Sequence, residues 1–295
     1  MYLCCHKQQC MIQSMTGYGK SIIELPNKKI TVEIKSLNSK NMDLNARVPS
    51  AYREKELELR DKISKNLSRG KVDFNLYVEL TGETTSTVVN EAVVKQYMGQ
   101  LSEIAESSAS ELLKMAVRLP DALKTEREEI DDEEFKKISQ AVDEALEAIN
   151  GYRTDEGAVL ENEFHQRIQN IATLLDQVIE LDPQRIENVK ERLHKAVSEV
   201  KETVDENRFE QELIYYLEKY DITEEKVRLK NHLDYFKETL ESNTSNGKKL
   251  GFISQEIGRE INTIGSKANF APMQQLVVQM KDELEKIKEQ ALNVL

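Results

Sequence analysis

The spacing of the apolar residues changes along this 295-residue chain, and the change limits the folds it can adopt. In residues 28–38 (KKITVEIKSLN) and 71–80 (KVDFNLYVEL), apolar side chains occupy every second position. This alternation is typical of half-buried antiparallel strands. After Pro120 the apolar residues recur mostly every three or four positions, as on the buried face of a helix. The sequence therefore predicts an α+β fold, with an N-terminal antiparallel sheet and helices followed by a long-helix C-terminal domain.

The segment between the two expected strands predicts a helix over residues 50–70. Ser50 follows Pro49 and is suited to cap its start, and Gly70 is suited to end it. Its apolar side is expected to consist of Leu57, Leu59, Ile63 and Leu67.

The loop around Pro120 separates two regions of different pattern. A helix is expected to begin near Asn90, and residues 117–123 (VRLPDAL) then break the pattern. We therefore expect an N-terminal domain over residues 11–119 and a mainly helical domain over 120–295.

The second region contains several helical stripes. One helix is expected to end before Pro183, because proline disrupts a helix interior, and another to follow over residues 183–204. Further helices are expected over 208–220 and 221–242, with Thr223 as a cap. The C-terminal stripe has coiled-coil-like spacing, which predicts a partner helix in this chain or in another subunit; it consists of Val277, Met280, Leu284, Ile287 and Ala291.

The cysteines are confined to the first ten residues, at positions 4, 5 and 10. A disulfide framework is therefore excluded for the remainder, and a reducing cytoplasmic setting is expected. Residues 1–10 are expected to be a disordered leader or the product of an upstream start codon, with Met11 as the natural start. No window of about 18 apolar residues predicts a membrane span.

The charge is distributed unevenly along the chain. The formal net charge is −12, which argues against a generally basic nucleic-acid-binding protein. Residues 121–225 carry 13 Lys and Arg against 30 Asp and Glu, whereas residues 226–267 carry 8 against 5. A phosphate-bearing partner would be repelled by the middle of the chain and tolerated by its flanks. The alternative is that the acidic middle is simply a solvated helical face.

The segment around His232 places four functional side chains on one expected helix face. Glu225, Arg228, His232 and Tyr235 are separated by three, four and three residues. An acid, a guanidinium and an imidazole together can hold a phosphate and move a proton. The alternative is an exposed face of ion pairs.

Residues 247–267 (GKKLGFISQEIGREINTIGSK) combine a core stripe with a polar side. Glu256 and Glu260 lie one turn apart, which is a natural half-site for a divalent cation such as Mg²⁺ or Mn²⁺. Arg259 offers a cation within the chain that could instead offset their repulsion. Gly251 and Gly258 each cost a helix about 1 kcal/mol relative to alanine, which suggests close backbone approach or strain. The core stripe consists of Leu250, Ile253, Ile257, Ile261 and Ile264.

Six motifs together resemble the YicC/YloC family of bacterial proteins. The resemblance runs in order from Met11 to the C-terminus, and it implies a cytoplasmic, metal-dependent endoribonuclease that acts on single-stranded RNA. It also implies a homohexamer around a channel, and a role in small-RNA turnover; no DNA or membrane partner is expected. Family members usually have Asp and Asn where this chain has Gly251 and Gly258. The motifs are MIQSMTGYGK, LSRGKVDFNLYVE, YRTDEGAVL, DENRFEQEL, EEKVRLKNHL and GKKLGFISQEIGREINTIGSK.

Within these motifs, the resemblance leads us to expect three groups of site residues. The catalytic residues expected are His232, Glu256, Arg259 and Glu260. A divalent metal, Mn²⁺ or Mg²⁺, is expected on Glu212, Glu256 and Glu260. RNA-binding residues are expected at Arg69, Lys71, Arg228, Lys248, Lys249 and Lys267. Two alternatives remain: a non-catalytic RNA-binding adaptor that works with another nuclease, and a structural oligomer whose carboxylates form ion pairs between subunits.

Overall fold

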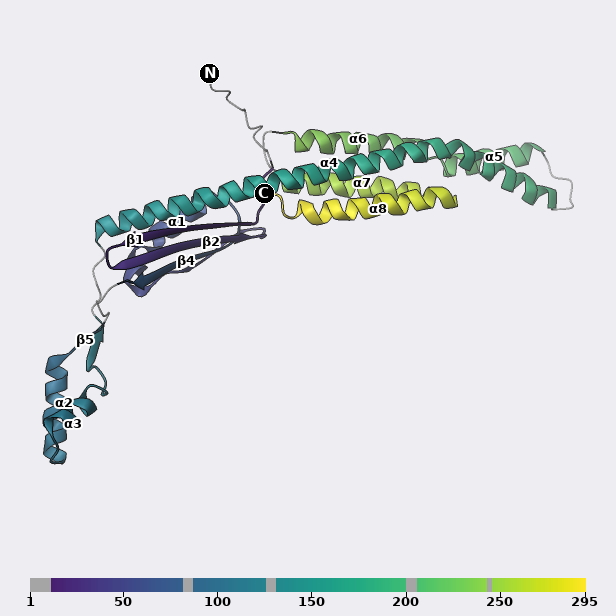
Figure 1. Cartoon of the computed structure of the whole chain (residues 1–295). Coiled ribbons are helices and arrows are strands. Elements are labelled where there is room, and N and C mark those ends of the chain that lie inside the picture. The colour runs from purple at the N-terminus through teal and green to yellow at the C-terminus, as the bar shows by residue number, and fades with distance from the viewer. Residues whose placement is uncertain (1–11, 82–86, 126–130, 200–205, 243–245) are drawn as a thin grey trace, which may run out of the picture.

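The structure is a computed structural model, and it describes residues 12–81, 87–125, 131–199, 206–242 and 246–295. The expected leader over residues 1–10 lies outside the described residues. Figure 1 shows an elongated molecule in which one long helix, α4 (Asp132–Glu199), runs from a sheet at one end into a helical bundle at the other. Within the described residues, no helix is both long and apolar enough to span a bilayer.

The N-terminal lobe is a four-stranded sheet covered by helices, as expected. The strand order is β1-β2-β4-β3, in which β1–β2 and β2–β4 pair antiparallel and β3–β4 pair parallel. The predicted strands are confirmed as β2 and β4, and their alternating side chains are buried against α1 and the first part of α4. The bounds are Gly17–Leu25 for β1, Lys28–Leu37 for β2, Met42–Arg47 for β3 and Gly70–Leu80 for β4.

The helix predicted between these strands begins with a 3₁₀ turn, η1 (Ser50–Lys55), and continues as α1 (Glu56–Leu67). Three of its predicted core residues are buried, but Leu57 is 79% exposed, because it lies about 200° around the helix from Leu59. Ser68, with φ of 55°, follows the helix, whereas Gly70 already opens β4. The expectation that Gly70 ends this helix was therefore wrong.

A small module lies beyond the sheet. It contains β5 (Thr87–Val89), α2 (Glu91–Ile104), α3 (Ala109–Ala116) and β6 (Leu123–Thr125). The helix predicted near Asn90 is confirmed as α2, and the expected boundary near residue 120 falls between α3 and β6. The two large hydrophobic cores of the molecule divide along α4, between Ile149 and Leu160.

Helix α4 passes through Pro183 without ending, so the predicted pair of helices over this region was wrong. Proline removes one backbone hydrogen bond and clashes with the preceding turn. Buried contacts beside it offset that cost. Arg185 binds Asp182 at 2.7 Å, and Lys226 of the neighbouring helix α6 binds the same carboxylate at 2.6 Å.

The C-terminal lobe packs α6 (Thr223–Leu240), α7 (Gly247–Lys267) and α8 (Ala271–Ala291) around the second part of α4, with α5 (Glu206–Lys219) towards the far end (Figure 1). The predicted apolar stripes of α6, α7 and α8 are all buried in one core. The partner of the coiled-coil-like stripe is within the chain, since α8 packs on α4 and α7.

The N-terminal segment and the C-terminus meet where the two lobes join. We call this contact the joint, and we define it by residues 12–16, Arg69, Arg153, Gly157 and 293–295. Ser14 N donates to the carbonyl of Arg153 at 3.0 Å, and Met15 N donates to that of Asn293 at 2.8 Å. Leu295 N donates to the carbonyl of Gln13 at 2.9 Å. The first described residues and the C-terminus are thus hydrogen-bonded to each other at the middle of the molecule.

Arg153 and Gly157 explain why the joint needs this part of α4. Arg153 is 2% exposed and donates to Met15 O and to Ser36 Oγ of β2. At Gly157 an added Cβ would lie 1.9 Å from the carbonyl oxygen of Ile12, so only glycine lets the N-terminal segment cross the helix there. Parts of the MIQSMTGYGK, LSRGKVDFNLYVE and YRTDEGAVL motifs therefore have a structural role.

Candidate functional site

The α6–α7 seam is the surface line where these two helices face each other, with Arg228, His232 and Tyr235 on α6 and Lys249, Glu256, Glu260 and Lys267 on α7. On each helix these residues lie along one side of the buried stripe. Two contacts show that these sides meet. Lys249 Nζ lies 4.6 Å from the centre of the Tyr235 ring, and Lys267 Nζ lies 2.7 Å from Glu225 Oε1. His232 and both glutamates lie between these end contacts along their helices.

The two glutamates of α7 have different surroundings, although the sequence presents them as a pair. Glu256 is partly exposed, and its Oε1 lies 2.7 Å from Arg259 Nη1. Glu260 is only 8% exposed, and it makes no hydrogen bond or ion pair within the part of the chain that the structure describes. Its oxygens are not among the fully buried unpaired polar atoms of the described residues, so water can still reach them. Glu260 therefore keeps free hydrogen-bonding capacity on the seam that also contains half-buried His232.

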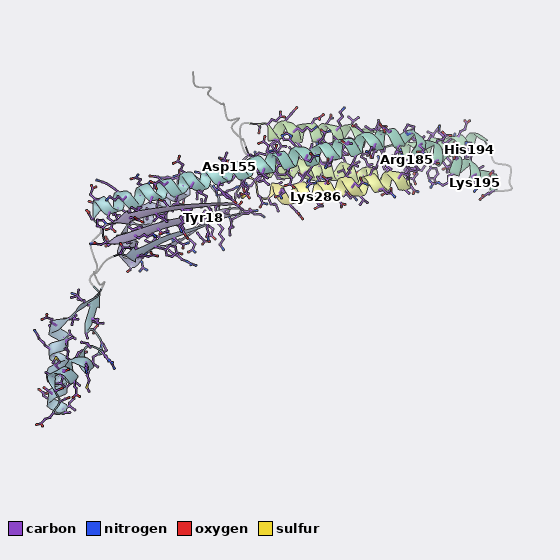
Figure 2. The ribbon with its side chains drawn as sticks, viewed as in Figure 1. Tyr18, Asp155, Arg185, His194, Lys195 and Lys286 are labelled. Carbon is purple, nitrogen blue, oxygen red and sulfur yellow. The ribbon has the colours of Figure 1, made fainter. Side chains whose placement is uncertain are left out.

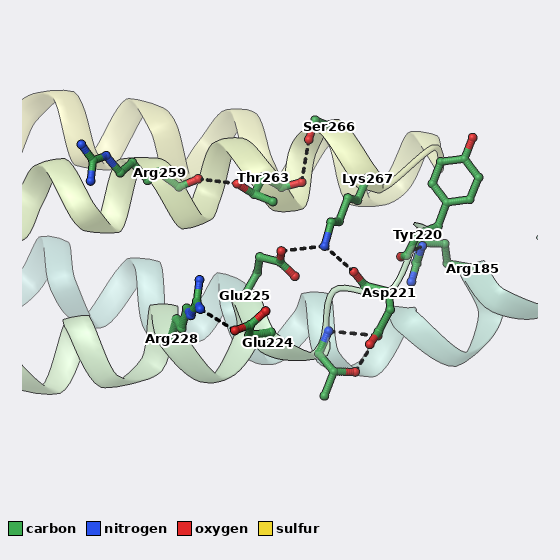
Figure 3. Close-up of polar contacts among 11 residues, drawn as sticks. Arg185, Tyr220, Asp221, Glu224, Glu225, Arg228, Arg259, Thr263, Ser266 and Lys267 are labelled. Atoms are coloured by element: carbon green, nitrogen blue, oxygen red, sulfur yellow. Dashed lines mark hydrogen bonds and ion pairs between the residues drawn. The ribbon is translucent and has the colours of Figure 1, made fainter. Parts of the chain in front are cut away.

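At the other end of the seam, Lys267 joins α7 to the start of α6 (Figure 3). Its Nζ donates to Glu225 Oε1 at 2.7 Å and to the backbone carbonyl of Asp221 at 2.9 Å. Glu225 is 6% exposed, and its Oε2 is buried with no hydrogen-bond partner in the described structure. Lys267 thus neutralises a buried acid and also fixes the turn before α6.

The prediction of Thr223 as the cap of α6 was wrong, because Ile222 occupies the N-cap position and the Asp221 side chain before it binds Thr223, the first residue of the helix. Asp221 Oδ1 accepts from Thr223 N at 3.0 Å and from Thr223 Oγ1 at 2.7 Å. The hydrogen bond from the Thr223 hydroxyl is the main reason that the Asp221 pKa lies below its usual range, and the backbone hydrogen bond acts in the same direction. The sequence analysis named only Thr223 as the cap, whereas the structure begins α6 at Thr223 and uses the preceding Asp221 to bind it.

We predict that Asp221→Ala lowers the free energy of unfolding by about 1 kcal/mol at neutral pH, as expected for a lost helix cap. Because the folded-state pKa is lowered, this stabilisation is present above the unfolded-state pKa and is lost as the pH falls through the folded-state pKa. Urea unfolding of both proteins at pH 7 and in increasingly acidic buffer measures the difference. A difference that grows in acid would contradict the assignment.

The four residues predicted to share a face on α6 do share it, but they do not bind one another. Arg228 pairs with Glu224 one turn earlier, while Glu225 pairs with Lys267. Tyr235 contacts Lys249. The predicted face is therefore divided among three contacts, two of which reach α7.

Three of the predicted RNA-binding residues lie near the joint. Arg69 donates to the carbonyl of Val294 at 2.7 Å, so it holds the C-terminus. Lys71 is exposed at the start of β4, and Lys248 is exposed in the first turn of α7. The start of α7 is itself at the joint, because Gly247 N donates to the carbonyl of Leu295.

The structure also separates Glu212 from the other two expected metal ligands. Glu212 is exposed on α5, whereas Glu256 and Glu260 lie on α7. Among the described residues, no three His, Cys, Asp or Glu side chains gather in a way that could hold a metal ion. A three-carboxylate metal centre therefore does not fit the described part of a single chain.

The two unusual glycines of α7 differ in their surroundings. A Cβ at Gly258 would lie 3.1 Å from Leu284 of α8, so this glycine permits a close helix approach. A Cβ at Gly251 would meet nothing within 4 Å, and the structure offers no packing reason for it.

Sequence reasoning missed a buried charged network behind the seam. Arg185 is 2% exposed and Asp182 is 5% exposed. Figure 2 shows Arg185 in the half of α4 away from the sheet. Arg185 Nη1 also donates to the carbonyl of Tyr220 at 2.8 Å. The spacing of three between Asp182 and Arg185 was an available signal, but Pro183 between them suggested a helix end instead.

Comparison with known proteins covers nearly the whole chain. A family model described as endoribonuclease YicC-like, N-terminal region, matches residues 12–162, and one described as endoribonuclease YicC-like, C-terminal, matches residues 178–295. A protein of Clostridioides difficile named "Probable endoribonuclease YicC" is 34% identical over 96% of this chain and its own full length. A protein of Haemophilus influenzae with the same name is 29% identical, with the same coverage of both chains.

Proposed function

The chain belongs to the YicC-like endoribonuclease family, and from that premise we propose that it is an endoribonuclease that cuts single-stranded RNA along the α6–α7 seam. One observation carries the choice of site. Glu260 is a nearly buried carboxylate without a partner in the described structure, and it lies along the same seam as half-buried His232. A carboxylate that lies beside the core without a partner is a candidate functional group, because most polar groups in such positions are hydrogen-bonded.

The proposed chemistry needs two proton movements. Breaking a phosphodiester bond requires that the attacking oxygen lose a proton and that the departing oxygen gain one. An imidazole can both donate and accept a proton, so His232 is suited to one of these transfers. The Glu260 carboxylate is proposed to accept or orient the other proton.

Cations along the seam are proposed to bind the RNA backbone. Arg228, Arg259 and Lys267 each pair with a glutamate, so a phosphate would compete with a carboxylate for each cation. Lys249 stands over Tyr235 and has no carboxylate partner in the described structure. The residues 226–267 that contain most of the seam are net positive, which supports phosphate binding in an otherwise acidic chain.

A divalent cation, Mn²⁺ or Mg²⁺, is proposed as a cofactor that is held by a carboxylate of this chain together with the phosphate of the RNA. Mg²⁺ is commonly held by one or two carboxylates together with phosphate oxygens of the substrate. Glu260 would supply such a carboxylate, and the bound ion would offset charge at the phosphate. Glu212 and Glu256 remain proposed ligands only if other subunits bring carboxylates together.

The finer biological proposals follow the family resemblance. We propose a homohexamer whose subunits surround an RNA channel, a cytoplasmic location, and a role in small-RNA turnover. Exposed apolar side chains at both ends of the molecule are available for subunit contacts, for example Ile214 and Tyr215 on α5 and Leu123 on β6.

One experiment tests the proposed activity. The chain is purified and incubated with an end-labelled single-stranded RNA, the matching duplex RNA and the matching single-stranded DNA, with Mn²⁺ or with EDTA. We expect internal cuts in the single-stranded RNA alone, and only with the metal. Cutting that persists in EDTA would contradict the metal proposal and leave the nuclease proposal intact. Salt-sensitive binding without any cutting would support the adaptor, and neither binding nor cutting would favour the structural oligomer.

A further inference from the structure

A cavity of about 270 Å³ lies between α4 and the turn that joins α5 to α6. Ile186, Val189 and Leu217 give it apolar walls, while Tyr220 and Asp221 line the side nearest the seam. The cavity adjoins the seam because the backbone carbonyl of Asp221 accepts from Lys267. Figure 3 shows Tyr220 and Asp221 beside Arg185 at this end of the seam.

The turn that carries Tyr220 and Asp221 is held from three directions. Buried Arg185 donates to the Tyr220 carbonyl, and Lys267 donates to the Asp221 carbonyl. The Asp221 side chain also binds Thr223 through Oδ1. A turn fixed in this way presents its side chains in one arrangement before any ligand arrives, which lowers the entropic cost of binding.

The chemistry of the cavity favours a flat, partly apolar ligand with a hydrogen-bond donor. Its aliphatic walls and the Tyr220 ring suit an aromatic face, since bases released from stacking commonly pack on tyrosine. Asp221 Oδ2 has no hydrogen-bond partner in the described residues, so it can accept from such a ligand. Arg185 and Lys190 also line the cavity, but each is paired with a carboxylate, Arg185 with Asp182 at 2.7 Å and Lys190 with Glu187 at 4.0 Å. A phosphate would therefore compete with these carboxylates and be repelled by Asp221.

We propose that the cavity receives one base of the RNA bound along the seam, with Tyr220 packing on the base and Asp221 Oδ2 accepting from its exocyclic amino group. This inference rests on the proposed function, because the RNA must follow the seam to reach the cavity. Adenine, cytosine and guanine carry an exocyclic amino group on the edge that pairs, whereas uracil carries none. The cavity therefore selects a base with an amino group over uracil.

Binding of labelled 12-nucleotide oligo(A), oligo(C) and oligo(U) to the full chain, measured by fluorescence anisotropy at one salt concentration, tests this proposal. Oligo(A) and oligo(C) should bind about 5-fold more tightly than oligo(U), as expected for one hydrogen bond. Asp221→Asn retains an oxygen to cap α6 and replaces Oδ2 with an amide donor. This variant should lose the preference or reverse it, and it should be no less stable than Asp221→Ala, because it keeps an acceptor for Thr223.

Tyr220→Leu tests the stacking separately. It should weaken binding of all three RNAs by at least about 5-fold, the lower range for loss of one base–aromatic contact. Tyr152→Leu is the matched control, because Tyr152 is 51% exposed on α4 and does not line the cavity, and it should change nothing.

Three results would overturn the cavity assignment: equal wild-type affinities for the three RNAs, a preference that survives Asp221→Asn, or a Tyr220→Leu variant that matches Tyr152→Leu. The result for the base-binding cavity can be distinguished from the result for the proposed nuclease activity. RNA that is cut without any base preference would refute the cavity and keep the nuclease. A base preference without cutting would keep the cavity and refute the nuclease, and failure to bind any RNA would refute both.

Discussion

Replacing Glu260 with glutamine should slow RNA cleavage by at least about 100-fold, the usual lower range for removing a group that acts in proton transfer. The same change should leave the thermal stability equal or higher. Glu260 is 8% exposed and has no hydrogen-bond or ion-pair partner in the described structure, so glutamine keeps the shape of the side chain and breaks no contact. Activity should therefore fall without any loss of stability. Single-turnover cleavage rates and thermal melts of the two proteins measure both effects.

Glu283→Gln is the matched control on the neighbouring helix. Glu283 is also largely buried, but it is bound by Arg167 at 3.2 Å, by Lys286 at 2.9 Å and by Asn170 at 3.0 Å. Its loss should lower the stability and leave the cleavage rate unchanged, because it lies on α8 outside the seam. If Glu260→Gln instead lowers stability and keeps full activity, Glu260 is a structural residue and the proposed site is wrong.

The contrast between Glu256 and Glu260 shows what a sequence pattern leaves open. Both positions are glutamates one turn apart beside the same apolar stripe, so periodicity treats them alike. Glu260 has buried isoleucines at positions 257 and 264, three residues before and four after it, whereas Glu256 has Ile253 on one side and Glu260 on the other. That local difference was a signal for the deeper position. The pairing of Glu256 with Arg259 could not be predicted from spacing alone, because it depends on where the structure places the two side chains.

The spacing of apolar residues predicted those strands and helices in which one face is buried and the other is exposed. The strands β2 and β4 and the stripes of α6, α7 and α8 were all found in this way, because one face of each is covered by the core. Pro183 shows the limit of that reasoning. Its local penalty is real, but the contact from Lys226 to Asp182 joins residues too far apart in sequence for a local rule to include it.

The joint could not have been predicted from spacing, because it brings together residues from both ends and the middle of the chain. The SMTG and YRTDEG segments were identifiable only as parts of a family resemblance, and that resemblance suggested function. In the structure they supply hydrogen bonds and a close backbone crossing between the lobes. A motif shared with relatives therefore indicates a constraint without revealing whether the constraint is catalytic or structural.

Gly157→Ala should destabilise the chain by at least about 2 kcal/mol, within the range for overpacking a tight contact and equivalent to a fall of roughly 4–8 °C in melting temperature. The new Cβ would lie 1.9 Å from the Ile12 carbonyl oxygen and 3.1 Å from the Gln13 Cα. The N-terminal segment would have to move away from α4, which would weaken the hydrogen bond from Ser14 to Arg153 and the one from Leu295 to Gln13.

Gly151→Ala, in the same helix, provides the opposite expectation. An added Cβ there meets nothing within 4 Å, and alanine is a better helix former than glycine by about 1 kcal/mol. The variant should therefore melt at the same temperature as the wild type or a higher one. Thermal melts followed by circular dichroism compare the three proteins, and limited proteolysis detects release of the N-terminal segment. If the two substitutions change the melting temperature by equal amounts, the crossing at Gly157 does not hold the lobes together. A fall confined to Gly157→Ala, with early cleavage near residues 12–16, would assign this family motif to the joint.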